Sequence, residues 1–327
     1  MLDYTQFDQI FGSLSPFPLD KSWAQKVESH RRTLDGALFL DRVLAALDLS
    51  QVIKNYPPKN ETALRQLHQH VCDAANVAVH HKLSILYYLL LDLDNNRPSP
   101  SSRGRSSSQP AAATAEDRAE EFAAHAAVPQ KYSIFMKGLW LLDSAQFDLA
   151  LEYLTHPSLV PDFADDIVVA LARHSARHLD GDYTLPLAYY HTVQPILKTS
   201  LAQELLFDAL ATSSVSEALA FARARPECMH QQLFRRLALS ALDPKRVAGD
   251  NEEMARRAFE LASLPLEDDE ERWLVETLNG PDAKKLKGTK DTLLMRRIAR
   301  GDVGSVSEKG NWAVVLEGFR KGSGGRV

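Results

Sequence analysis

Four prolines that end apolar helical stretches limit what this chain can fold into. The stretches ALEYLTHP, LAYYHTVQP, ALAFARARP and AFELASLP end at Pro157, Pro195, Pro226 and Pro265, which are separated by 38, 31 and 39 residues. A proline cannot continue a helix, and it moves the residue before it out of helical geometry. Helices that stop at such intervals indicate a chain built from helical units of similar length.

One further helix is predicted with each of these stops. In the stretch IVVALARHSARHL, within 165–179, apolar residues recur with helical spacing, and the same pattern predicts helices over 200–212, 230–242 and 270–279. No stretch shows sustained strand alternation. Each unit is therefore a helix pair, and the sequence predicts an all-α fold, an irregular α-helical solenoid. The alternative is a globular helical domain whose helices happen to end in proline.

A Ser- and Pro-rich stretch divides the predicted helices. Residues 95–114 contain almost no large apolar side chains, so this segment cannot bury enough surface to offset the entropy of ordering. We expect a helical block over 1–94, a disordered loop over 95–114, the solenoid block over 115–300 and a C-terminal segment over 301–327. The segment ends in GFRKGSGGRV, which has the composition of a frayed tail.

Composition narrows the classes of function. The chain has 327 residues and a formal net charge of -5, so as a whole it is not built to coat nucleic acid. Its two cysteines exclude a disulfide framework and indicate a reducing compartment. We expect no signal peptide and no transmembrane segment, because the apolar stretch ILYYLLLDL is far shorter than the roughly 20 residues of a membrane span.

The sequence gives little sign of catalysis or of a metal site. The motifs of nucleotide-binding loops, serine hydrolases and zinc peptidases are absent, and Cys228 has no obvious basic partner. Two predicted helices carry five metal-ligand side chains without a known zinc-binding spacing, which favours histidines on partly polar helix faces. These five are His68, His70, Cys72, His80 and His81. We expect no enzyme activity, no cofactor, no metal and no small-molecule substrate.

Three charged segments could either contact a partner or have only a local structural role. LEDDEER, at 266–272, places acids where they would cap the helix that carries Trp273. Arg103 and Arg105 form an Arg-Gly-Arg element of the kind that enters the minor groove of DNA. A basic segment over 284–300 could contact a partner, act as a nuclear-import signal or be a solvated helix face. Its candidate contact residues are Lys284, Lys285, Lys287, Arg296 and Arg297.

Two tracts resemble a known family. KYSIFMKGLWLLDSAQFDLALEYLTHPSL, from Lys131 to Leu159, resembles the helical domain of ELYS-like nucleoporins, with its apolar helix, Trp-Leu-Leu-Asp step and acidic-aromatic helix start. KLSILYYLLLDL, from Lys82 to Leu93, resembles the tyrosine- and leucine-rich helix of the same family. The resemblance covers roughly 35–280 of this chain.

The resemblance implies a scaffold protein of the nuclear pore complex, located in the nucleus at the nuclear envelope. Its partners would be nucleoporins of the Y-shaped outer-ring subcomplex. Animal members add a β-propeller and a chromatin-binding tail, and we expect neither here, as in the short fungal form. A DNA- or chromatin-binding adaptor is the alternative, and a helical regulatory subunit or enzyme is the third interpretation.

Aromatic residues at the two ends of the chain are the candidates for partner binding. Interfaces favour exposed aromatics, and both ends are more apolar than a free tail requires. These candidates are Trp312, Phe319, Tyr4, Phe7 and Phe11. The segment around Trp312 is either a cap or a docking helix, and we expect a chain cut after Asp282 to stay folded. A packing role is expected instead for Trp140, Leu141, Leu142, Phe147, Leu151 and Tyr153.

Overall fold

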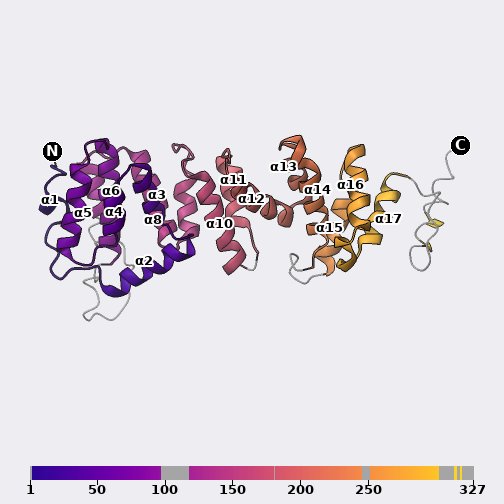
Figure 1. Ribbon diagram of the computed structural model, residues 1–327, viewed down its shortest axis with the longest axis horizontal. Coiled ribbons are helices and arrows are strands. Elements are labelled where there is room, and N and C mark those ends of the chain that lie inside the picture. The colour runs from indigo at the N-terminus through magenta and orange to yellow at the C-terminus, as the bar shows by residue number, and fades with distance from the viewer. Residues whose placement is uncertain are drawn as a thin grey trace, which may run out of the picture. The chain divides into compact units, whose positions relative to one another are not determined.

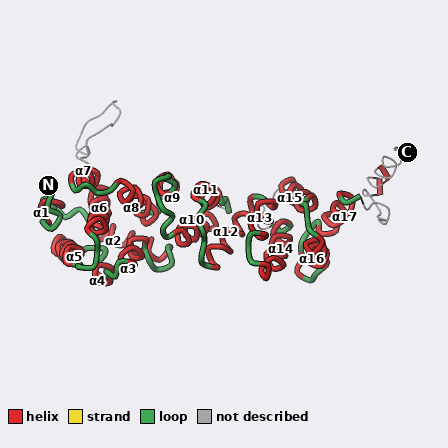
Figure 2. Tube along the Cα trace, turned by 90° about the horizontal axis from the view of Figure 1, so that it is seen from above, coloured by secondary structure: helices red, strands yellow, loops and turns green. Residues whose placement is uncertain are grey.

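Helices form all the regular structure in the part of the chain that is described (Figures 1 and 2). The computed structural model describes residues 2–96, 118–179, 181–244, 251–301, 313–314 and 317–318. These residues confirm the prediction of an all-α chain. They divide into two compact units, unit 1 with 1–162 and 191–195, and unit 2 with 163–190 and 196–327.

Unit 1 is arranged around one central helix, α6. Every residue of α6 from Lys82 to Leu93 is buried, and α5, α7 and α8 pack against it. A helix that is apolar on all sides can be stable only inside a protein. Lys82 donates from Nζ to the carbonyl of Cys72 over 2.6 Å, so its charge lies at the C-terminal end of α5. The helices are α1 (Phe7–Phe11), α2 (Lys21–Thr33), α3 (Phe39–Ala46), α4 (Ser50–Asn55), α5 (Glu61–Asp73), α6 (Val79–Asn95), α7 (Arg118–His125), α8 (Gln130–Asp143) and α9 (Phe147–Leu154).

Unit 2 contains three of the helices that were predicted to stop before a proline. α11, α13 and α15, like α9 of unit 1, end two or three residues before their prolines, which confirms this prediction. The helices are α10 (Ala164–His178), α11 (Thr184–Val193), α12 (Ser200–Ser213), α13 (Val215–Arg223), α14 (Glu227–Ala241), α15 (Asn251–Ser263), α16 (Asp268–Asn279), the 3₁₀ helix η2 (Asp282–Lys285) and α17 (Thr289–Ala299). The last three residues of α11 group with unit 1.

The helices of unit 2 pack in chain order. From α12 onward each helix packs against its second neighbour: α12 on α14, α13 on α15, α14 on α16 and α15 on α17. Contacts between sequence neighbours are typical of helical repeats. Unit 1 differs, because its α3 packs against α8 across a long stretch of sequence. A solenoid for the chain as a whole stays a prediction.

The division into units differs from the predicted one. The sequence placed it in the loop 95–114, whereas the structure places it after Asp162. The reason is that α7 and α8 pack on α6 and so belong with the N-terminal helices. Asn95 ends α6, and residues 97–117 lie outside the described part, where the disorder expected for this loop stays a prediction.

The helix α17 is part of the core of unit 2. It packs against α15 and α16, and its Thr292 and Leu294 are buried. A cut after Asp282 would uncover apolar surface on both helices, which argues against the expectation that the shortened chain stays folded; that expectation stays a prediction.

No helix in the described ranges combines the length and the apolar character that crossing a membrane requires.

Candidate partner-binding surfaces

The N-terminal aromatic residues pack inward instead of facing solvent. Phe7 and Phe11 are 8% and 0% exposed, and their ring centroids lie 5.6 and 5.9 Å from that of His68 on α5. The guanidinium carbon of Arg65 lies over the Phe7 ring, 4.0 Å from the ring centroid. The expected exposure of these two side chains was therefore wrong. Tyr4 is half-buried, and a role for it in partner binding stays a prediction.

The histidine and cysteine of α5 bind the N-terminal segment. His68 Nε2 donates to the carbonyl of Tyr4 over 3.0 Å, and Cys72 Sγ lies 3.4 Å from the same nitrogen. Burial lowers the pKa of His68 and raises the pKa of Cys72 to about 11. Cys72 is therefore a protonated thiol at neutral pH and a poor nucleophile. His70 is exposed, and its ring lies 3.3 Å from the Asn55 amide.

A second group of rings lies where α6 and α8 begin. His80 and His81 have ring centroids 4.2 Å apart, and those of His80 and Tyr132 are 4.9 Å apart. Burial lowers the pKa of His81. Cys228 lies in the first turn of α14, next to the helix cap, and is exposed. Among the described residues, no three His, Cys, Asp or Glu side chains are grouped to hold a metal ion.

Four of the candidate contact residues lie outside the described part of the chain. These residues are Trp312, Phe319, Arg103 and Arg105. Their proposed roles stay predictions.

Four of the five candidate contact residues in the basic segment are exposed. Lys284 and Lys285 in η2, Lys287 after it and Arg297 on α17 all face solvent. Arg296 is only 9% exposed, which corrects its assignment as a free basic contact.

Arg296 is buried because it binds groups from two neighbouring helices. Its Nε donates to Glu271 over 2.8 Å, and a terminal nitrogen donates to the carbonyl of Ala262 over 2.9 Å and also to that of Leu264. These carbonyls lie at the C-terminal end of α15, which has no further helical donors to satisfy them. Arg296 thus holds α17 to both α15 and α16.

The acidic run caps α16, as predicted. The Glu270 carboxylate accepts from the backbone N–H of Glu267 over 2.9 Å and forms an ion pair with Arg223 of α13. The hydrogen bonds that it accepts lower the pKa of Glu270 against the opposing effect of burial.

Most of the packing residues predicted from the Trp-Leu-Leu-Asp tract are buried. Trp140, Leu141, Leu142 and Phe147 are at most 8% exposed. Leu151 and Tyr153 on α9 are half-buried only, because α9 packs chiefly on α8 with its other face.

A buried carboxylate, Asp92, joins α6 to α8. It accepts from the indole Nε1 of Trp140 over 2.8 Å and from the hydroxyl of Tyr56 over 2.9 Å. Its burial raises the pKa of Asp92 to about 7, although both hydrogen bonds favour the charged form. The Tyr56 ring also meets Trp23 and Tyr88 edge to face.

A second buried carboxylate, Asp143, holds the start of α3. Its two oxygens accept from the backbone N–H groups of Phe39 and Leu40 over 2.7 and 3.0 Å, and the Tyr88 hydroxyl donates to it over 2.8 Å. Burial raises the pKa of Asp143 to about 7, against these hydrogen bonds. The first amides of a helix have no partner inside the helix, and Asp143 supplies one from α8. Since both carboxylates are enclosed by core side chains, their role is structural.

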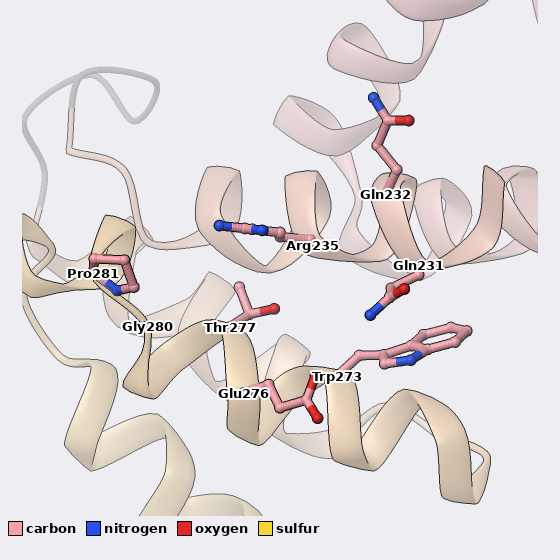
Figure 3. Close-up of a pocket in the computed structure, with 8 residues that line it drawn as sticks. All are labelled: Gln231, Gln232, Arg235, Trp273, Glu276, Thr277, Gly280 and Pro281. Atoms are coloured by element: carbon pink, nitrogen blue, oxygen red, sulfur yellow. The ribbon is translucent and has the colours of Figure 1, made fainter.

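A groove of about 430 Å³ lies between α14 and α16 in unit 2 (Figure 3). Its half-buried Trp273 packs on Phe234, with ring centroids 6.1 Å apart. The sequence predicts Trp273 on this helix but not the groove, because the residues that face Trp273 come from another helix. The lining residues are Gln231, Gln232, Arg235, Trp273, Glu276, Thr277, Gly280 and Pro281.

Comparison with known proteins agrees with the tracts that carry the resemblance. A family model described as "ELYS: Nuclear pore complex assembly" matches residues 37–281, more than half of the chain. A curated protein of Schizosaccharomyces pombe, described as "Uncharacterized protein ely5", is 23% identical over 205 residues, which are 61% of this chain and 59% of that protein. The match thus spans less than two thirds of that relative.

The family match includes α6, α8 and α9, and the buried network of Asp92 and Asp143 that joins them to the preceding helices. The chain therefore belongs to the ELYS family of nuclear pore complex assembly, and its location is the nuclear pore complex at the nuclear envelope.

Proposed function

We propose that the chain is a non-catalytic scaffold component that associates with the Y-shaped outer-ring subcomplex of the nuclear pore through its helical surfaces. The observation that carries this proposal is the family match over 37–281, which includes helices of both compact units. Helices packed in chain order, as in unit 2, leave faces of several helices open to other proteins.

Affinity purification from nuclear-envelope extract, followed by mass spectrometry, tests this function. We expect the tagged full chain to enrich subunits of the outer ring together, and nuclease treatment should leave this enrichment unchanged. Recovery of histones and DNA that nuclease abolishes would instead support a chromatin adaptor. Enrichment of no outer-ring subunit in either condition would contradict the proposal.

A further inference from the structure

Four lysines near the start of α17 lack the ion pairs that many arginines of unit 2 form. Seven arginines of this unit form ion pairs: Arg223, Arg235, Arg236, Arg256, Arg272, Arg296 and Arg300. Lys284, Lys285, Lys287 and Lys290 are exposed, and none of them forms an ion pair with a residue that the structure describes. Several unpaired lysines in one short turn create a local positive field, although the chain as a whole has a net charge of -5.

This lysine turn continues directly from the groove between α14 and α16. Pro281 lines the groove, and η2 begins at the next residue, Asp282. Asp282 forms an ion pair with Arg235, which also lines the groove. Arg235 thus lies at the end of the groove from which the lysine turn continues in sequence.

The other end of the groove is aromatic and amide-lined. Gln231 extends from α14 toward Trp273 of α16, whereas Arg235 runs toward the end at Pro281 (Figure 3). Gln232 points away from α16, and Glu276 lines the groove from the α16 side (Figure 3). A side-chain amide can donate to and accept from a peptide backbone, and an indole face takes an apolar side chain.

We propose that this surface binds an extended acidic segment of a partner protein, with one apolar side chain on Trp273 and its carboxylates at the lysine turn. The inference rests on the proposed scaffold function and assigns a surface to it. We call the surface the basic groove, and its residues are Gln231, Arg235, Trp273, Thr277, Lys284, Lys285 and Lys287.

The shape and extent of the charge favour an acidic peptide over nucleic acid. A protein that follows duplex DNA neutralises about six to ten phosphates along a continuous track. The lysine turn is short, and Asp282 and Asp291 flank it in sequence. An acidic segment needs only a few cations, and its carboxylates would compete with Asp282 for Arg235.

Fluorescence anisotropy with the full chain and a labelled peptide tests the basic groove. The probe is a twelve-residue peptide of Glu and Asp with one central Phe. We expect the triple variant Lys284→Glu, Lys285→Glu and Lys287→Glu to weaken binding at least about tenfold. The matched control carries Lys21→Glu, Lys26→Glu and Lys59→Glu, three exposed lysines of unit 1, and should change binding less than about twofold.

An exposed glutamine outside the groove provides a control for the groove itself. Gln231→Glu places a negative charge beside the bound segment and should weaken binding of the peptide severalfold, whereas Gln51→Glu, at an exposed glutamine of unit 1, should have little effect. Circular dichroism should show the same helix content in all variants. Equal effects of the paired variants, or no binding of the peptide by the wild-type chain, would overturn the proposal.

Competing ligands and the ring purification separate the remaining outcomes. Tighter binding of a twelve-base-pair duplex or of phosphatidylserine vesicles than of the peptide, at equal salt, would overturn the acidic-segment proposal. If the wild-type chain enriches the outer ring and the triple variant does so equally, the groove is wrong and the scaffold function stands. If the wild-type chain enriches no ring subunit, the scaffold function fails, and with it the role of the groove in the ring.

Discussion

Trp140 and Asp92 join α8 to α6 through a buried hydrogen bond, in which the indole Nε1 donates to the carboxylate over 2.8 Å. The two residues are 48 positions apart in the sequence and lie in the two tracts that resemble the ELYS family. The bond explains why a tryptophan, rather than another large apolar residue, stands at this place in α8. A phenyl ring would fill part of the same space but could not satisfy the carboxylate.

Replacing the Trp140 indole should therefore lower the free energy of unfolding by more than the loss of its packing volume would explain. We expect Trp140→Phe to lower the free energy of unfolding by about 1–3 kcal/mol, because Asp92 loses a donor inside the core. Trp140→Ala should lower it by about 3–5 kcal/mol. Urea denaturation measures both, with Trp23→Phe as control: Trp23 is 9% exposed, and its indole N–H has no hydrogen-bond partner among the described residues. Equal losses for the two Trp→Phe variants would show that the bond to Asp92 adds no stability.

Replacing each buried carboxylate with an amide, by Asp→Asn substitution, should affect stability differently at Asp92 and Asp143. In Asp92→Asn, the amide oxygen can accept from Trp140 and the amide nitrogen can donate to the Tyr56 hydroxyl, so stability should change by less than about 1 kcal/mol. In Asp143→Asn, the amide nitrogen must face the backbone N–H of either Phe39 or Leu40. That clash should cost about 2 kcal/mol or more. Urea unfolding at pH 8 compares the variants, and similar losses would contradict this arrangement.

Stability should depend on pH because both carboxylates have a pKa of about 7 in the folded chain, against an ordinary value of 3.8. Between about pH 4 and 7 the native state then holds more protons than the unfolded state. The free energy of unfolding should fall as pH rises through this window, by at most about 1.4 kcal/mol per pH unit for each proton. Glu120 and Glu270 have lowered pKa values, so their opposite contributions are lost only as pH falls below about 4.5.

The urea midpoint at pH 5, 6, 7 and 8, at one ionic strength, measures this dependence. Asp92→Asn should flatten the curve, because one of the two groups no longer titrates. A midpoint that rises steadily from pH 5 to 8 in the wild-type chain would mean that both carboxylates are ionised in the folded state throughout.

Helix positions could be predicted from the sequence because they depend on local spacing. The apolar period and the proline stops predicted α9, α11, α13 and α15, and the tyrosine- and leucine-rich tract predicted the helix α6 by its resemblance to the family. The partners of buried polar groups could not be predicted in the same way. Asp143 binds the backbone of Phe39, 104 residues earlier, and no local pattern contains that distance.

Exposure was mispredicted where a distant side chain covers an aromatic or a cation. Phe7 and Phe11 follow helical spacing, which indicates one apolar face of α1 but not that His68 lies against it. A signal was available for Arg296, because it lies four residues after Thr292 and so on the same helix face, which is buried. The groove at Trp273 gave no such signal, because Gln231 and Arg235 come from α14.

Adjacent arginines on α17 offer a test of the helix-end contacts. Arg296→Ala should lower the free energy of unfolding by about 3 kcal/mol, because it leaves Glu271 and the carbonyls of Ala262 and Leu264 without their buried donor. Arg297→Ala, at an exposed position one residue later, should change it by less than about 0.5 kcal/mol. Urea unfolding compares the pair at one salt concentration. A loss of equal size in both would mean that helix propensity, and not the buried contact, determines the effect.

Gly138 lies where α8 packs tightly on α9, and the sign of the stability change on Gly138→Ala tests that contact. Alanine in place of glycine normally stabilises a helix by about 1 kcal/mol. Here a Cβ would lie 2.7 Å from Cγ and Cδ2 of Leu154 and 3.3 Å from Cβ of Tyr153. Leu154 is 4% exposed and has little room to move. Since overpacking costs about 1–3 kcal/mol, we expect Gly138→Ala to destabilise the chain by about 1 kcal/mol in net terms.

Repeating Gly138→Ala in a chain that already carries Leu154→Ala separates the steric overlap from any other effect of the added methyl group. Leu154→Ala should itself be destabilising by about 2–5 kcal/mol, because it opens a cavity under α9. In that background Gly138→Ala should become neutral or stabilising, because the overlapping atoms are gone and the helix propensity of alanine remains. The coupling between the two positions in a double-mutant cycle should therefore be favourable by at least about 1 kcal/mol. If Gly138→Ala stabilises the chain with Leu154 intact, then α8 and α9 lie farther apart than the contact at Gly138 requires.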